Sequence, residues 1–456
     1  MLLQTTPATT LAQIPRTLHP EALETPEELQ AFYKTEIENA RGIDRTGQMK
    51  ICLEDAHAAQ LPFKAFLLGH PGVGKTTEVN KLLLELEQQF RPLRLSVLSE
   101  LNPGTLRYYD VLLLILIRLV FEVSQAQVIG FEDTDLPKML ADVRDHLAKK
   151  WTRHLQVDAA EFGAGVSIPF LKLFGNIKQG RTRERGSEEY ELSLVSELTD
   201  LMNTVLQECN RLLRKHQERR EWVVVLEDLE KIGLSPTALK ELFMGLRPSL
   251  QSLDGHFIVV IPIWLKYSKD ADICRPPNFE SFVLPDIAVY QQSHQRDEKT
   301  IAALKAVVTA RVNEDLFADG VLERFCIASG GNLRDLFLMI RSAMLSARLR
   351  YANTISAEDA DTAVAGLRID YKNSLGSTGQ DDAETPLSKK LDRLVAIYQR
   401  KDPSVEVPDP VLYLLLRRRC VLQYNGAGWV GVHPLLVDLL IEFRKLEPGS
   451  PGGSLP

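Results

Sequence analysis

A glycine-dense corner at residues 69–76 carries the residues best suited to chemistry. It reads GHPGVGKT and matches the pattern G-x-x-x-x-G-K-[ST]. Glycines at positions 69, 72 and 74 let a backbone adopt positive φ and approach a ligand closely, so that successive N–H groups point into one concavity. A helix that begins behind them adds partial positive charge. The corner therefore predicts a cradle for phosphate groups.

Two side chains of this loop have defined tasks in such a cradle. Lys75 is expected to reach the β- and γ-phosphates of ATP, and the Thr76 hydroxyl is expected to ligate Mg²⁺. The alternative is a plain glycine turn, but the apolar run AFLL before it and the helical spacing of TTEVNKLLLELEQQF after it favour nucleotide binding. We expect the whole loop to contact the nucleotide: Gly69, His70, Pro71, Gly72, Val73, Gly74, Lys75, Thr76 and Thr77.

A second acidic motif completes such a site. The run VVVLEDLEK places Glu227 and Asp228 at the end of an apolar strand, as a Walker B motif does, with Glu227 at the metal and Asp228 beside the attacking water. The usual order begins with aspartate, so Glu227 is a departure that makes hydrolysis less certain than binding. Without the upstream glycine loop, the same run would be interpreted as a buried strand that ends in a charged loop.

The next apolar run, HFIVVIPIWL, is expected to lie beside both motifs. Many ATPases carry a polar γ-phosphate sensor at the end of this strand, but residues 262–264 are Pro, Ile and Trp. This sensor is therefore missing or replaced, and Trp264 is interpreted as a packing residue. Arg275 follows, before a returning strand. It is either an arginine finger that acts on a neighbouring copy's ATP or, as we favour, a surface arginine before a turn.

The run SGGNLRDLF at 329–337 predicts the entry of a lid helix. Gly330 and Gly331 make a sharp turn, Asn332 can cap the helix, and Arg334 in its first turn can reach back to the γ-phosphate. The alternative is a solvated arginine after a glycine turn, and we favour the sensor.

The composition limits the protein's class. The chain of 456 residues carries a net charge of −7, which gives no general attraction to nucleic acid or anionic membrane. Five scattered cysteines without a C-x-x-C pair suit a reducing cytosol and argue against a zinc site or a disulfide framework. The first residues lack the basic and apolar regions of a signal peptide, and the most apolar segment, 111–121, is too short to span a bilayer. We expect a cytoplasmic protein.

Alternating apolar strands and helices predict a three-layer α/β core with a parallel sheet, followed by an all-helical lid and a winged-helix domain. The expected divisions are a helical lead-in (1–45), the ATPase core (46–287) with an insertion (134–190), the lid (288–372), a polar linker (373–388), the winged helix (389–447) and a disordered tail (448–456).

These motifs, in this order, resemble the AAA+-type P-loop ATPases of the additional-strand group, which includes origin-recognition initiators and STAND signalling ATPases. The resemblance covers about residues 45–445, and its last element holds Tyr424, Trp429 and the run His433-Pro434-Leu435. It implies ATP and Mg²⁺ as ligands, Glu227 and Asp228 at the metal and water, and Arg334 as a second sensor. The Glu-Asp order and the lack of a polar sensor at residues 262–264 depart from the family's pattern, and they fit a slow switch better than a motor.

Three functional hypotheses follow. The first is a nucleotide-dependent switch whose lid and winged helix relay its state to assembly or a protein partner; the resemblance extends this to prokaryotic signalling or phage defence. The second is a DNA-binding initiator or loader, supported by arginines 417–419 but opposed by a mostly apolar reading helix, PVLYLLLRRR. The third is a nucleic-acid, membrane or partner contact at 160–186, where residues 171–186 hold five basic residues and one acidic residue. For this segment we favour the alternative, a hairpin packed on the core with a solvated basic loop.

Overall fold

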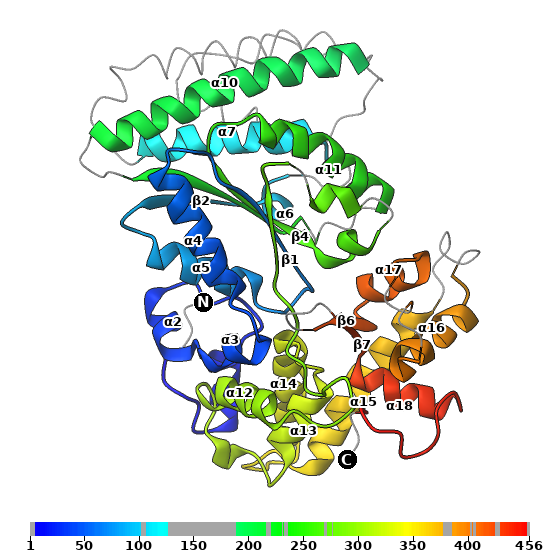
Figure 1. Ribbon diagram of the computed structural model, residues 1–456. Helices are drawn as coiled ribbons and strands as arrows, with labels where there is room; N and C mark the ends of the chain where they lie inside the picture. The colour runs from blue at the N-terminus through cyan, green and yellow to red at the C-terminus, as the bar shows by residue number, and fades with distance from the viewer. Residues whose placement is uncertain are drawn as a thin grey trace, which may run out of the picture.

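A computed structural model describes most of the chain (Figure 1). The described residues are 5–101, 106–125, 188–215, 220–229, 231, 236–268, 271–275, 277–376, 385–401, 404, 407–424 and 429–453. Most of the insertion at 134–190, the linker residues 377–384 and the hairpin turn at 425–428 lie outside them, so the predictions made there are not addressed by the structure.

The centre of the molecule is a parallel sheet of five strands in the order β2-β3-β4-β1-β5. The strands are β1 (Lys64–Gly69), β2 (Phe90–Ser96), β3 (Glu221–Glu227), β4 (His256–Pro262) and β5 (Glu280–Val283). β4 pairs in parallel with both β1 and β3, which confirms that this strand lies between the glycine loop and the acidic motif. Because the strands are parallel, their carboxyl ends, including Gly69, Ser96 and Glu227, meet at one edge.

Both faces of the sheet are covered by helices, which explains the continuous apolar runs. Alternate strand residues divide between two cores: Leu67 and Val225 pack under α4 (Arg45–Ala58) and α5 (Lys75–Glu85). Their neighbours Phe66 and Leu226 pack against the helices of the opposite face. Those helices are α6 (Val97–Glu100), α7 (Tyr108–Gln125), α10 (Glu188–Lys215) and α11 (Pro236–Gln251). The predicted three-layer α/β core is confirmed.

Two groups of helices flank the carboxyl edge of the sheet (Figure 1). The N-terminal group comprises η1 (Leu11–Gln13), α1 (Ile14–Thr17), α2 (Pro26–Phe32) and α3 (Glu36–Arg41). The later, all-helical group comprises α12 (Glu298–Thr309), η6 (Glu314–Leu316), α13 (Val321–Ala328), α14 (Leu333–Leu349) and α15 (Ala357–Leu375). The N-terminal group packs on the later one, with α3 against α12 and η1 against α14, so the lead-in bridges the core and the lid.

The C-terminal module consists of α16 (Leu387–Gln399), α17 (Pro410–Arg417), the antiparallel strands β6 (Val421–Gln423) and β7 (Val430–Val432), and α18 (Pro434–Glu442). It is joined to the core by the short 3-10 helices η4 (Ile263–Tyr267) and η5 (Ala271–Cys274), since α17 packs on η4. Trp264 of η4 makes an edge contact with the Tyr413 ring, so its interpretation as a packing residue is confirmed. A winged helix remains a prediction for this module.

Part of the C-terminal tail lies within the described residues. Of residues 448–456, residues 448–453 have defined positions, and the hydroxyls of Tyr398 and Tyr290 donate to the carbonyl oxygens of Pro451 (2.7 Å) and Gly453 (2.6 Å). Composition could not reveal this, because backbone carbonyls rather than apolar side chains hold the segment. Within the described residues, no helix is long and apolar enough to cross a membrane.

Candidate functional site

The glycine loop forms the turn between β1 and α5. Gly72 has φ of 88° and Gly74, the N-cap of α5, has φ of 104°, as predicted for residues that must expose backbone N–H groups. Gly69 is different because it is the last residue of β1, and its φ is not positive. What requires glycine there is space, since an added Cβ would lie 2.8 Å from the Leu284 carbonyl oxygen.

The loop's lysine is buried and already oriented. Lys75 is 5% exposed, and its Nζ donates to the carbonyl oxygens of Gly69 and His70, each at 3.0 Å. This ammonium therefore lies over the concave side of the loop, where a phosphate would meet it. Thr76 lines the same cavity. The Thr77 hydroxyl accepts the Leu23 backbone N–H at 3.2 Å, which ties α5 to the N-terminal segment.

The acidic pair at the end of β3 is held by β2. Arg94 donates from Nε (3.1 Å) and Nη2 (2.7 Å) to Oε2 of Glu227, while Oε1 of Glu227 is buried and has no hydrogen-bond partner among the described residues. The Ser96 hydroxyl lies 2.5 Å from Oδ2 of Asp228, and Nζ of Lys231 lies 2.5 Å from Oδ1. Burial alone would raise the pKa of Asp228, but the hydrogen bonds from Lys231 and Ser96 outweigh it and lower that pKa.

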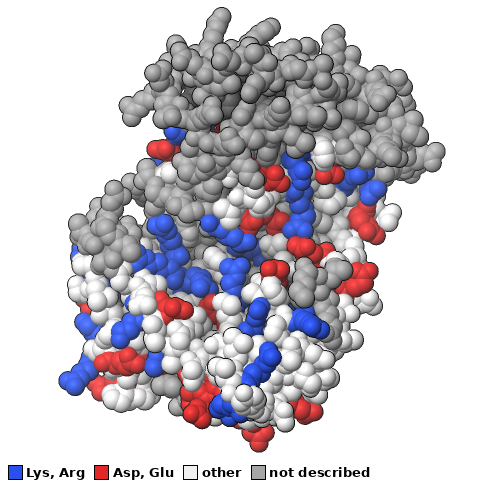
Figure 2. Space-filling view, turned by 180° about the vertical axis from the view of Figure 1, so that it is seen from behind, with Lys and Arg blue, Asp and Glu red and all other residues white. Residues whose placement is uncertain are grey.

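Both motifs open into one cavity of about 400 Å³. Its wall combines the glycine loop, the acidic pair, the N-terminal segment and the lid, and basic side chains outnumber acidic ones. Figure 2 shows Lys and Arg side chains gathered around a hollow on one face of the molecule. The charged lining residues are Glu21, Glu24, Lys34, Arg41, Lys75, Glu78, Arg94, Glu227, Asp228, Lys231, Arg311 and Arg334. Such a surplus of positive charge suits a polyphosphate.

The lid contacts the glycine loop directly. Asn332 caps α14 by accepting the Asp335 N–H at 3.3 Å, as predicted, and its amide Nδ2 also donates to the Pro71 carbonyl oxygen at 3.0 Å. The Arg334 N–H donates to the Gly72 carbonyl oxygen at 3.4 Å, and the Arg334 side chain lines the cavity. Most of the predicted site residues line this cavity, but Gly69, His70 and Val73 of the loop do not, and neither does Arg275, which is exposed.

The turn before α14 is also the docking point of the C-terminal module. Asp335 is fully buried and accepts hydrogen bonds from Nη1 of Arg419 (2.9 Å) and from the Tyr371 hydroxyl (2.6 Å). The Tyr424 hydroxyl donates to the Gly330 carbonyl oxygen at 3.2 Å, and His433 caps α18 beside them. The turn at 329–335 therefore meets Arg419, Tyr424 and His433 of the C-terminal module.

A buried pair lies between the loop and this turn. Asp286, fully buried after β5, accepts the second Asn332 amide hydrogen at Oδ1 (3.1 Å), and its Oδ2 lies 3.9 Å from Nε2 of His70. Burial raises the pKa of Asp286 to about 7 and lowers the pKa of His70 to about 3, so His70 is neutral at physiological pH. Gly331 packs so tightly here that an added Cβ would overlap the Ile287 carbonyl oxygen.

Sequence reasoning missed three of the site's arginines. Arg41 is buried, pairs with Glu78 of α5 and donates to the Val73 carbonyl oxygen at 2.6 Å. Arg311 is 5% exposed, and burial lowers its pKa to about 9. Arg94 could have been suspected, because it lies two positions before the end of β2 and the neighbouring strand β3 ends in Glu227. Nothing local distinguishes the other two from surface arginines.

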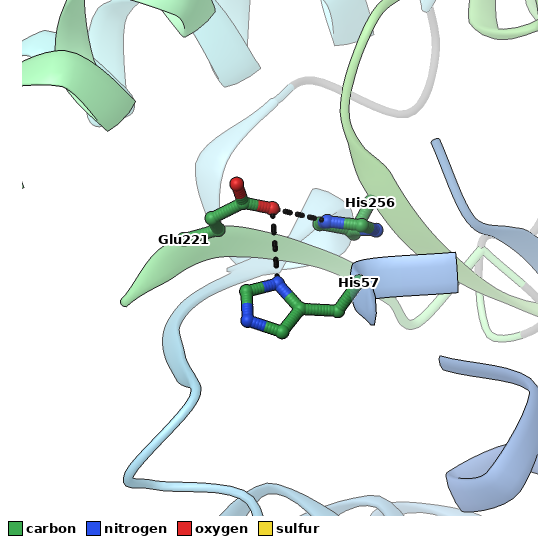
Figure 3. Close-up of side chains that lie close together, drawn as sticks. All are labelled: His57, Glu221 and His256. Atoms are coloured by element: carbon green, nitrogen blue, oxygen red, sulfur yellow. Dashed lines mark hydrogen bonds and ion pairs between the residues drawn. The ribbon is translucent and has the colours of Figure 1, made fainter. Parts of the chain in front are cut away.

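A second polar cluster lies at the opposite, amino edge of the sheet (Figure 3). Oε2 of Glu221 lies 2.9 Å from Nε2 of His256 and 3.3 Å from Nδ1 of His57, and Arg214 also pairs with this carboxylate. The Phe63 backbone N–H donates to Nδ1 of His256 at 3.2 Å, so neutral His256 carries its hydrogen on Nε2. A metal ion would need that nitrogen's lone pair. The cluster is therefore a hydrogen-bonded clamp on Glu221 rather than a metal site.

Comparison with known proteins finds similarity in structure only. No family model matches the chain, and no curated protein matches it. Similar solved structures include the Aeropyrum pernix ORC2 protein (13% identity, covering 88% of this chain and 93% of that chain, TM-score 0.40). The Walker-type ATPase of Pyrococcus abyssi (13%, 93% and 99%, TM-score 0.42) and the Thermotoga maritima RuvB branch migration motor (12%, 94% and 99%, TM-score 0.36) are others.

The similar structures thus include an origin-recognition protein and a Walker-type ATPase. The likeness extends over most of both chains. Because the identities and TM-scores are low, it decides neither family membership nor activity by itself.

Proposed function

We propose that this chain binds ATP with Mg²⁺ in the cavity between core and lid and acts as a slowly hydrolysing nucleotide switch. The observation that carries the proposal is that the glycine loop, the acidic pair and Arg334 line one basic cavity. Phosphates would lie against the loop's N–H groups and the Lys75 ammonium. The Thr76 hydroxyl and Glu227 carboxylate are hard oxygen ligands of the kind Mg²⁺ prefers, and Oε1 of Glu227 has no described partner. The metal would neutralise phosphate charge.

Slow turnover is proposed on three features. The acidic pair has the order Glu-Asp, no polar sensor follows β4, and Arg94 holds Oε2 of Glu227. Each feature leaves the attacking water less well positioned than in a fast enzyme.

The output is proposed to travel through Asn332. Its amide donates to the Pro71 carbonyl oxygen in the loop and to Asp286, while its oxygen caps α14. A loop that moves to accept phosphates would break or shift these bonds, and α14 carries Asp335, to which Arg419 of the C-terminal module is tied. Nucleotide state would thereby change the pose of the lid and the C-terminal module together.

Nucleotide binding and phosphate release, measured on purified protein with Mg²⁺, test the proposal. We expect Lys75→Ala to weaken ATP binding by about tenfold or more, as loss of a buried charge partner does. Lys299→Ala, at an exposed lysine of α12, is the matched control and should bind as the wild type does. Arg334→Ala should keep binding but lose the nucleotide-dependent change in protease cleavage between lid and core. Wild-type protein that binds no ATP would end the proposal.

Arg275 belongs to this proposal only as a residue acting in trans. Its exposure and its distance from the chain's own cavity are compatible with contact to a second copy. Mixing Arg275→Ala with Lys75→Ala protein tests this, because a mixed assembly pairs an intact cavity with an intact finger. Restored ATP turnover, together with a larger solution mass in a slowly hydrolysed ATP analogue, would support the role. Inactive mixtures and an unchanged monomer mass would leave a switch that acts within one chain.

The alternative, a DNA-binding initiator or loader, is less favoured by the chain's own contacts. The three arginines that supported it are engaged internally: Arg417 lies over the Trp264 ring, Arg418 donates to the Ser374 and Gly376 carbonyl oxygens, and Arg419 binds Asp335. A salt-sensitive shift of duplex DNA, abolished by Arg417→Ala, would revive it.

A further inference from the structure

One face of α14 carries arginines and leucines in alternation. Arg334, Leu338, Arg341, Leu345 and Arg348 follow one another at intervals of four and three residues, with Leu349 beside the last. At 100° per residue these six side chains fall within an arc of about 100° on the helix. We call this surface the α14 stripe; it is about 20 Å long, from 1.5 Å of rise per residue.

The leucines of the stripe are exposed to solvent in the described structure. Leu338 is 44% exposed, Leu345 56% and Leu349 81%. The opposite face of α14 is the packed one: it holds Leu336, Met339, Ile340 and other buried residues, and it meets α13, α15 and the N-terminal helices. Exposed leucines at helical spacing are costly to leave in water, which is why such surfaces mark contacts.

The arginines of the stripe have no partner among the described residues. Arg334, Arg341 and Arg348 make no ion pair or side-chain hydrogen bond there, whereas Arg350, just beyond the stripe, pairs with Asp359. The only acidic residue in α14, Asp335, is buried on another face. The α14 stripe is therefore cationic, although the net charge of the whole chain is −7.

We propose that the α14 stripe is the docking site for an acidic amphipathic helix of a partner protein. Charge complementarity selects this occupant: carboxylates at seven-residue intervals would meet the three arginines, and apolar side chains between them would cover the leucines. DNA offers phosphates but nothing for the leucines. A membrane suits leucines separated from the cations, whereas here Leu338 and Leu345 each lie between two arginines on the same line. The stripe begins at Arg334, so its occupant touches a residue of the nucleotide cavity.

The test uses the full chain without nucleotide and a labelled helical peptide of about 18 residues, with Glu at seven-residue intervals and Leu between them. Fluorescence anisotropy should show saturable binding that weakens as salt is added, because the ion pairs are exposed. Arg341→Glu/Arg348→Glu should weaken binding by about tenfold or more, since two attractions become repulsions. Leu345→Ser/Leu349→Ser should weaken it severalfold with the same salt dependence.

Lys299→Glu/Lys389→Glu, at exposed lysines of α12 and α16, is the matched charge control and should leave the affinity unchanged. The same peptide with Lys in place of Glu should not bind. The proposal is overturned if the acidic peptide does not bind, if the double reversal on the stripe behaves as the control does, or if duplex DNA or phosphatidylserine vesicles bind through these arginines in its place. Because binding is measured without nucleotide and should persist in Lys75→Ala, failure here is separate from failure of the proposed switch.

Discussion

Replacing Arg419 by methionine should loosen the C-terminal module from the lid. Arg419 donates to Oδ1 of Asp335 at 2.9 Å, and the side chain of Asp335 is fully buried while that of Arg419 is 25% exposed. Removing the cation leaves a buried carboxylate with the Tyr371 hydroxyl as its remaining close donor. Methionine keeps the length and the apolar stem of the side chain, so the change isolates the charge.

The magnitude follows from burial. Breaking a buried ion pair on one side costs about 3–5 kcal/mol, and the partial exposure of Arg419 lowers this to about 2–4 kcal/mol. Arg417→Met, two residues earlier, is the matched control. Arg417 lies 5.9 Å from the Trp264 ring centroid, and loss of that contact should cost only about 0.5–1 kcal/mol.

Urea unfolding of the full chain, followed with a probe in the C-terminal module, measures both variants. Repeating Arg419→Met in an Asp335→Asn background completes a double-mutant cycle, in which the cost should fall to about 1 kcal/mol because no buried charge is left unpaired. The reasoning is refuted if Arg419→Met costs no more than Arg417→Met, or if the costs of Arg419→Met and Asp335→Asn are additive. In either case the Arg419–Asp335 pair does not hold the C-terminal module on the lid, and the proposed route from nucleotide to module loses its last step.

Three further outcomes are expected. Gly331→Ala should cost at least about 2 kcal/mol in the urea midpoint analysis because of backbone overlap at positive φ, whereas Gly320→Ala, with nothing within 4 Å of the added Cβ, should cost about 1 kcal/mol. The pKa of Glu221 is lowered from 4.5 to about 2, and the hydrogen bond from His256 is the largest cause. The ionised Glu221 therefore stabilises the folded protein by at most about 3 kcal/mol above pH 4.5, and this contribution is lost as the pH falls toward 2. Glu221→Gln should be less stable than the wild type at about pH 7 and approach the wild type near pH 2. Arg94→Met should lower the Mg²⁺ concentration for half-maximal ATP binding severalfold, since a pair whose arginine is 33% exposed contributes on the order of 1 kcal/mol and its loss frees Glu227; an unchanged Mg²⁺ dependence would contradict a metal role for that carboxylate.

What the sequence could predict was local. The strand, glycine loop and helix at 64–85 follow from spacing within some twenty residues, and so do the glycine turn and cap before α14. The place of β4 between β1 and β3 followed from a general property of parallel sheets, whose buried strands are continuous apolar runs. These features need no information about distant residues.

What the sequence could not predict depends on pairs far apart in the chain. Arg41 meets Glu78 across 37 residues and Arg419 meets Asp335 across 84, and an isolated arginine looks the same whether its carboxylate is buried or absent. The contact of the tail at Gly453 is of the same kind, because Tyr290, far upstream, supplies the hydrogen bond. Even within the loop, sequence rules assigned Gly69 a positive φ when the real constraint is a neighbouring carbonyl oxygen.

The contacts of the lid also limit what kind of movement a switch could use. The C-terminal module is tied to the start of α14 by the Arg419–Asp335 pair and by the Tyr424 hydrogen bond to Gly330. The lid, in contrast, is tied to the loop chiefly through Asn332 and the Arg334 backbone, which are single hydrogen bonds of 3.0 and 3.4 Å. Two bonds that include a buried charged pair resist separation more than two neutral bonds do. The contact between lid and loop is therefore the weaker of the two, so we expect ATP to break the Asn332 and Arg334 bonds to the loop before the module leaves the lid. Movement of lid and module together would also have to loosen the packing of α17 on η4 of the core.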